Sequence, residues 1–135
     1  MRESYRFELD PENKILMLRF QGNKLTDALL QEVYDAMREC SAVIDPQAVI
    51  ADFSSVVQVD LSTTFINQLA NRPPPVPRPT ESPGVLVCGT NTLYGMARMF
   101  QMLAEVTHPR VRVVRTLDEA IKILRFPTVR FEFLP

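Results

Sequence analysis

The chain is poor in the residues on which metal sites, cofactor sites and nucleophilic catalysis usually depend. Its 135 residues include one histidine, two cysteines, four glycines and no tryptophan. His108, Cys40 and Cys88 are far apart in the sequence and do not have the spacing of a metal site. The sequence has no Gly-x-Ser-x-Gly nucleophile motif and no Gly-x-Gly-x-x-Gly phosphate loop. We therefore expect no metal, no cofactor, no catalytic residues and no enzymatic activity.

The chain also lacks long apolar runs and an excess of charge of one sign. No apolar run approaches a length of about 20 residues, which a membrane-spanning helix needs. The charged, alternating start MRESYRFELD does not resemble a signal peptide. Fifteen basic and sixteen acidic side chains give a net charge of −1, which provides no general attraction for nucleic acid. We expect a cytoplasmic protein with reduced cysteines, without membrane insertion and without nucleic-acid binding.

What the sequence does contain is the composition of an ordinary globular domain. Apolar residues make up 46% and charged residues 23% of the chain. A chain of this size buries about two-thirds of its surface on folding, so its core needs no disulfide or metal. We expect residues 1–135 to form one domain.

Hydrophobic periodicity predicts a hairpin followed by alternating helices and strands. Polar and apolar residues alternate over Tyr5–Leu9, a more apolar strand follows at Ile15–Phe20, and Pro11 lies in the turn between them. Apolar residues then recur every three or four positions up to Cys40, which predicts a helix of about 15 residues with Thr26 as its N-cap. The later predicted elements are a strand at 48–51, a helix capped by Asp60 or Ser62 and ending near Asn71, a strand at 84–89, a helix at 91–105, a strand at 111–114 and a helix that starts at a capping box on Thr116 and ends before Pro127.

This order of elements predicts an α/β fold whose sheet is largely parallel after the first hairpin. Residues 73–83 contain six of the eleven prolines and are interpreted as a stiff internal loop. In the tail, residues 127–135, apolar residues alternate at Val129, Phe131 and Phe133, so the tail can form an edge strand. That strand either stays within the chain or exchanges with a second copy across a two-fold axis.

Only Asp52, Asp60 and His108 stand out as residues that an active site would use. Asp52 follows a buried strand, where an aspartate more often satisfies the N–H groups of the following loop. His108 precedes a strand, and its simpler interpretation is a loop histidine. An enzyme would need all three side chains to converge on one substrate position.

Four segments carry a resemblance to a known family. They are Leu18–Gly22 with the helix after Thr26, Val49–Val56 with Val59–Ser62, Val85–Gly89 with a helix that contains Met99–Phe100, and Val113–Ala120. Together, over about residues 5–125, they resemble the STAS domain family, which comprises the anti-sigma-factor antagonists and their relatives. The resemblance implies a small mixed sheet with helices mainly on one side, and a module that binds rather than catalyses.

The resemblance also implies a partner-binding loop at residues 60–64. In the antagonists, a serine directly after a signature aspartate is phosphorylated, which adds about −1.5 to −2 of charge at a helix N-terminus. Asp60 matches this aspartate, Leu61 stands at the position of that serine, and Ser62 matches the next serine. The chain is therefore expected to lack the standard phosphorylated serine. Its implied partner-binding residues are Asp60, Leu61, Ser62, Thr63 and Thr64, with Ser62 as the candidate phosphoacceptor.

Two hypotheses about function follow. The first is a regulatory module of STAS type that binds a protein partner or a second copy of itself, and we expect a homo-oligomer. The second is a small-molecule or lipid-binding protein with an apolar pocket near helix 91–105. Its basis is the group Met96, Met99, Phe100 and Met102, since methionine packs adaptably and often marks a contact surface.

Overall fold

The computed structural model describes residues 4–75 and 83–134. These residues form four helices and eight strands, most of them at the positions that the hydrophobic periodicity predicts. In chain order the elements are β1 (Tyr5–Asp10), β2 (Ile15–Phe20), β3 (Lys24–Thr26), α1 (Asp27–Ile44), β4 (Ala48–Asp52), β5 (Gln58–Asp60), α2 (Thr63–Asn71), β6 (Gly84–Val87), α3 (Asn91–Leu103), β7 (Val111–Val114), α4 (Leu117–Leu124) and β8 (Glu132–Phe133).

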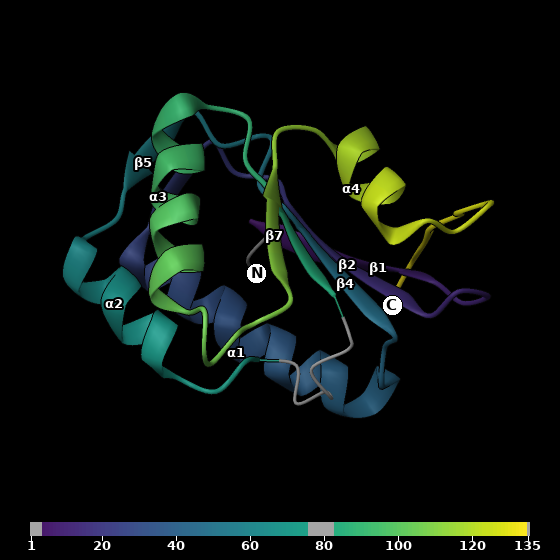
Figure 1. Cartoon of the computed structure of the whole chain (residues 1–135). Helices are drawn as coiled ribbons and strands as arrows, with labels where there is room; N and C mark the ends of the chain where they lie inside the picture. The colour runs from purple at the N-terminus through teal and green to yellow at the C-terminus, as the bar shows by residue number, and fades with distance from the viewer. Residues whose placement is uncertain (1–3, 76–82, 135) are drawn as a thin grey trace.

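The main sheet is mixed, and its six strands lie in the order β7-β6-β4-β2-β1-β8. Strands β2, β4, β6 and β7 are parallel, and β1 forms an antiparallel hairpin with β2. Figure 1 shows α1, α2 and α3 on one side of this sheet and α4 on the other. The predicted α/β class, with its hairpin and its mixed sheet, is therefore confirmed.

Each face of the sheet has its own hydrophobic core. Side chains alternate along β2, so that Leu16, Leu18 and Phe20 face α1 and α3. The intervening Ile15 and Met17 face the opposite core, which α4 covers. A strand buried on both faces needs apolar residues at nearly every position, which explains the continuous apolar run in this part of the sequence.

Side-chain caps fix where the helices begin. Thr26, Ser62, Thr90 and Thr116 each accept a hydrogen bond from the backbone N–H three residues later. The cap of α2 is thus Ser62 and not Asp60. Helix α1 is longer than predicted, because it continues past Cys40 and ends where Asp45 adopts a left-handed conformation.

Two short strands that the sequence analysis did not predict form a second, two-stranded sheet. Strands β3 and β5 are parallel, and Thr26 lies opposite Asp60. The first turn of α1 follows directly from β3, and the loop into α2 follows from β5. This small sheet therefore places the N-terminal ends of α1 and α2 side by side.

The C-terminal tail returns to the edge of the main sheet. Strand β8 pairs antiparallel with β1 of the same chain, with Phe133 opposite Glu8. Val129 and Phe131 pack against the core beneath α4, whereas Phe133 remains 68% exposed. Of the predicted proline-rich loop at 73–83, residues 76–82 lie outside the described residues.

Candidate functional site

A largely apolar cavity of about 370 Å³ lies between the main sheet and the three helices on its larger covered side. Strands β4 and β6 form its floor, and α1, α2 and α3 contribute to its walls. Small residues leave the space open where larger side chains would fill it. Ala51 and Gly84 line it from the floor and Ala97 from α3, and a Cβ atom added at Gly84 would meet nothing within 4 Å.

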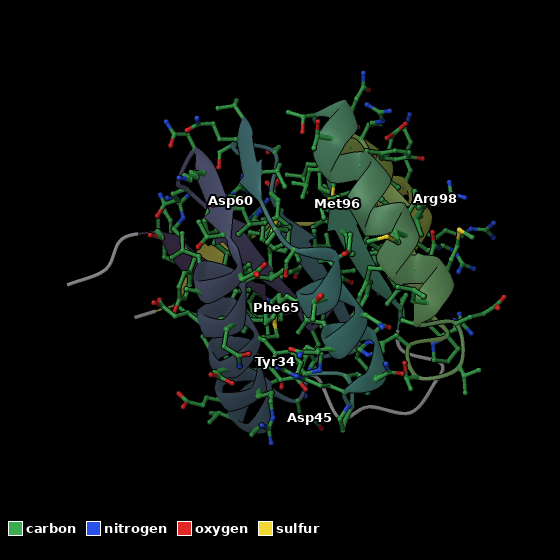
Figure 2. The ribbon with its side chains drawn as sticks, turned by 90° about the vertical axis from the view of Figure 1, so that its left-hand side faces the viewer. Tyr34, Asp45, Asp60, Phe65, Met96 and Arg98 are labelled. Atoms are coloured by element: carbon green, nitrogen blue, oxygen red, sulfur yellow. The ribbon has the colours of Figure 1, made fainter. Side chains whose placement is uncertain are left out.

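The helices turn apolar side chains toward this space. Leu30 and Tyr34 line it from successive turns of α1, as Met96 and Phe100 do from α3. In Figure 2, Met96 lies on the edge of α3 nearest α2, and Arg98 extends from the opposite edge. Of the residues on which the pocket hypothesis was based, Met96 and Phe100 line the cavity. Met99 does not line it, and Met102 is 72% exposed.

One end of the cavity is formed by the loop between α3 and β7, which carries its polar groups. Thr107, His108 and Arg110 line the cavity there, close to Pro74 and Pro83. The Thr107 hydroxyl donates a hydrogen bond to the Ala70 carbonyl oxygen. These contacts connect the loop to the end of α2. Sequence reasoning did not identify Thr107 or Arg110 as site residues.

His108 is part of this wall and is only 7% exposed. Its Nε2 lies 2.9 Å from the carbonyl oxygen of Arg72, which requires a donor, so we place the ring proton on Nε2. Burial lowers the pKa of His108, and the carbonyl groups of Arg72 and Leu69 oppose this effect without cancelling it. The imidazole is therefore neutral at pH 7, and its role here is to tie the loop to α2.

The residues predicted to bind a partner lie at the N-terminal end of α2. Asp60, Ser62, Thr63 and Thr64 are exposed, and Leu61 is half-buried and lines the cavity. The Ser62 hydroxyl accepts a hydrogen bond from the backbone N–H of Phe65 at 3.0 Å and donates one to the Asp27 carboxylate at 2.8 Å. The Ser62 backbone N–H also donates to Asp27, at 2.9 Å. Ser62 therefore connects the first turns of α1 and α2.

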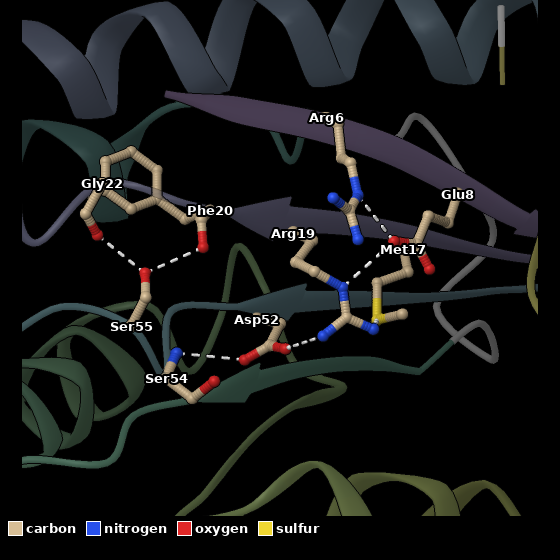
Figure 3. Close-up of polar contacts among 9 residues, drawn as sticks. All are labelled: Arg6, Glu8, Met17, Arg19, Phe20, Gly22, Asp52, Ser54 and Ser55. Atoms are coloured by element: carbon tan, nitrogen blue, oxygen red, sulfur yellow. Dashed lines mark hydrogen bonds and ion pairs between the residues drawn. The ribbon is translucent and has the colours of Figure 1, made fainter. Parts of the chain in front are cut away.

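Asp52 lies at the end of β4 within a cluster of charges on the α4 side of the sheet (Figure 3). Its carboxylate accepts hydrogen bonds from the Ser54 N–H at 3.0 Å and from the Arg19 guanidinium at 3.1 Å. Arg19 also pairs with Glu8 at 3.0 Å, and Glu8 pairs with Arg6 at 2.8 Å. The interpretation that Asp52 satisfies a loop N–H was correct, and the ion pair with Arg19 was not predicted.

The structure does not bring the three candidate catalytic residues together. Asp52 ends β4, whereas His108 precedes β7. Because these strands are parallel, the two residues lie at opposite ends of them. Asp60 belongs to the separate two-stranded sheet.

The Cys88 thiol is buried, and burial together with the nearby Asp52 charge raises its pKa to about 12, although Arg115 acts to lower it. Cys88 therefore remains a neutral thiol at pH 7.

Comparisons with protein-family models, with curated proteins and with solved structures found no match to this chain. Within residues 4–75 and 83–134, no three histidine, cysteine, aspartate or glutamate side chains are grouped so that they could hold a metal ion. In the same part of the chain, no helix has both the length and the apolar character needed to cross a membrane.

Proposed function

We propose that this protein is a binding module that holds a small apolar molecule, or the acyl chain of a lipid, between its sheet and its helices. The observation that carries the proposal is the cavity of about 370 Å³. Ligand sites in proteins typically measure about 300–1,000 Å³ and combine apolar walls with a few polar groups. Here the apolar walls come from the sheet and three helices, and the polar groups gather at the α3–β7 loop.

The physical basis of binding is the poor hydration of such a space. An apolar cavity of about 150 Å³ can remain dry and bind an aromatic molecule, because water finds too few hydrogen-bond partners there. The present cavity is larger and partly open to solvent, and its walls are built from side chains such as Leu93 and Phe100. A ligand that enters removes its own apolar surface from water, at about 25 cal/mol per Å².

The direct test is a titration with N-phenyl-1-naphthylamine, a neutral probe whose fluorescence rises in apolar surroundings. We expect a saturable increase in fluorescence with one probe per chain. Native mass spectrometry of the purified protein should also detect any ligand that remains bound. A titration without saturable binding, in a sample whose circular dichroism shows a folded α/β protein, would contradict the proposal.

Filling the cavity should weaken binding without unfolding the protein. In Ala97→Leu, the larger side chain projects from α3 into the cavity, and we expect at least a tenfold loss of probe affinity. The free energy of unfolding should stay the same or rise by about 1 kcal/mol, as is typical of cavity-filling changes. Fluorescence titration and urea unfolding measure the two effects.

Gly95→Ala is the matched control for this change. Gly95 lies two residues away on α3, and a Cβ atom there would meet nothing within 4 Å. The substitution should stabilise the helix by up to about 1 kcal/mol and leave probe affinity unchanged. Equal losses of affinity in both variants would show that the probe senses helix stability rather than the cavity.

A second candidate function is regulation through a protein partner that docks on the loop at residues 60–64, as the STAS resemblance implies. It is favoured by the exposure of Asp60, Ser62, Thr63 and Thr64 together at one helix N-terminus. The test is a pull-down with the unchanged protein and with a double variant, Asp60→Lys and Thr64→Lys. A partner that the unchanged protein retains, and that the double variant loses while still binding the probe normally, would support this function. A partner retained equally by both proteins would contradict it.

The contact between Ser62 and Asp27 makes the charge state of position 62 important for stability. Asparagine and aspartate are comparable N-caps, but the carboxylate of Ser62→Asp would face the Asp27 carboxylate. We expect Ser62→Asp to be less stable than Ser62→Asn by about 0.5–1 kcal/mol at low ionic strength, and the difference to shrink with added salt. Urea unfolding at two salt concentrations measures this. Equal stability of the two variants at low salt would show that Asp27 does not sense a charge at position 62.

A further inference from the structure

The charge among the described residues that line the cavity is of one sign, which indicates the chemistry of its ligand. Arg110 is the one charged residue among the described residues that line the cavity, and no carboxylate lines it there. Arg110 also takes part in none of the ion pairs found among the described residues. Arg110 is therefore a cation at the α3–β7 end of the cavity, which we call its mouth, and it has no carboxylate partner among the described residues.

The position of Arg110 suits it to hold the head of an amphiphile. The residue is exposed, at the start of β7, while neighbouring His108 is buried. Its backbone carbonyl accepts a hydrogen bond from the N–H of Gly84, which lines the floor of the cavity. The backbone of Arg110 is thereby fixed beside the cavity, and the residue is exposed to solvent.

The other polar groups at this end are already engaged. The Thr107 hydroxyl donates to the Ala70 carbonyl, and the His108 ring is bonded to the Arg72 carbonyl and is neutral at pH 7. Neither group supplies a positive charge. An ionised group placed deeper in the cavity would lose its hydration without a compensating partner, so the charge of a ligand belongs at the mouth.

The size of the cavity limits the apolar part of the ligand. A methylene group needs roughly the volume of a water molecule, about 30 Å³. A cavity of about 370 Å³ thus has room for one chain of about a dozen carbons.

We propose that the cavity takes a single-chain acidic amphiphile, with its hydrocarbon chain between the sheet and the helices and its anionic head paired with Arg110. This inference rests on the proposed function and specifies its ligand class. A carboxylate suits this site because it forms two parallel hydrogen bonds with one guanidinium group. A cationic amphiphile of equal length would instead be repelled at the mouth.

The test compares ligands of equal length and different charge. Decanoate, decan-1-ol and decylamine are each used to displace bound N-phenyl-1-naphthylamine. We expect decanoate to compete at least tenfold better than decan-1-ol, and decylamine to compete worst. In Arg110→Gln this preference should fall to about twofold or less, and in Arg110→Glu decylamine should compete better than decanoate.

The matched control is Arg112→Gln, which removes the same charge from an exposed residue of β7 that does not line the cavity. It should leave the preference for decanoate unchanged. If the neutral probe binds but decanoate shows no preference over decan-1-ol, or if Arg112→Gln abolishes that preference as fully as Arg110→Gln does, the ligand class proposed here is wrong. If the neutral probe itself does not bind, it is the proposed function that fails.

Discussion

Replacing Arg19 by methionine should lower the free energy of unfolding by about 3 kcal/mol at pH 7. Arg19 lies between two carboxylates, with Nε 3.0 Å from Glu8 and Nη1 3.1 Å from Asp52 (Figure 3). The side chains of Glu8 and Asp52 are only 8% and 2% exposed. Methionine fills much of the space of arginine but leaves Asp52 buried without a counter-charge.

The size of this effect follows from the cost of an unpaired buried charge. Removing one member of a buried ion pair typically costs about 3–5 kcal/mol, because the remaining ion keeps its desolvation penalty and loses its partner. Glu8 retains Arg6 as a partner, whereas the remaining hydrogen bond of Asp52 comes from the Ser54 N–H. The loss should therefore lie near the lower end of that range.

Arg6→Met provides the matched control. Among the described residues, Arg6 forms an ion pair with Glu8 only and lies over the Phe133 ring, and its side chain is 36% exposed. Its removal should therefore cost about 1 kcal/mol or less. Urea unfolding followed by circular dichroism measures both variants. If Arg19→Met is no more destabilising than Arg6→Met, Arg19 does not balance the buried Asp52 carboxylate as the structure indicates.

The core elements of the fold could be predicted from local patterns. Strands β2 and β4 are buried on both faces, and a strand in that position shows a continuous apolar run that is easily recognised. Helix α1 has one buried face, marked by Val33 and Met37, so its apolar residues recur with the helical period. In these segments the buried positions follow the period of the strand or helix itself, so they can be recognised in the local sequence.

The charge cluster could not be predicted, because it depends on strand register. Arg6 lies opposite Arg19 across β1 and β2, and Arg19 lies opposite Asp52 across β2 and β4. In the sequence, Arg6 and Glu8 are the polar positions of an alternating strand, a pattern typical of a solvent-exposed face. Strands β3 and β5 were missed for a related reason, because three residues are too few to show a period.

The cavity was anticipated in part. Methionine and phenylalanine at positions 96 and 100 of α3 suggested an apolar contact surface, and both line the cavity. The opening itself depends on Ala51, Gly84 and Ala97, small residues of three different elements that come together only in the folded chain. The cation at its mouth, Arg110, looked like one of several solvated arginines near the C-terminus.

The other large effect on stability is expected at the β1–β2 turn, from Asp10→Asn. Asp10 is 2% exposed, and its carboxylate accepts hydrogen bonds from the N–H groups of Glu12, Asn13 and Arg130 and from the Asn13 side chain. An asparagine would turn an amide NH₂ toward one pair of these donors. We expect a loss of about 2 kcal/mol at pH 7, typical of losing hydrogen bonds to a charged group.

This loss should depend on pH in a defined direction. Burial acts to raise the pKa of Asp10, but the hydrogen bonds from Asn13, Arg130 and Glu12 outweigh it, so the pKa lies below its ordinary value of 3.8. A group whose pKa is lower in the folded state stabilises the fold fully above its unfolded-state pKa. That stabilisation decreases as the pH falls through the folded-state pKa. The unchanged protein should therefore lose its advantage over Asp10→Asn below about pH 4.

Urea unfolding at pH 7, 5, 4 and 3 tests both the size and the direction of this effect. Glu12→Gln is the control, since Glu12 is exposed in the same turn and should change stability by about 0.5 kcal/mol or less. Because Asp10 also bonds the Arg130 N–H, and Asn13 bonds the Thr128 carbonyl, weakening this turn should loosen the C-terminal tail as well. Amide hydrogen exchange should then become faster in residues 128–134 of Asp10→Asn. Unchanged exchange there, together with a stability difference that does not vary with pH, would show that the Asp10 carboxylate does not hold the turn and the tail together.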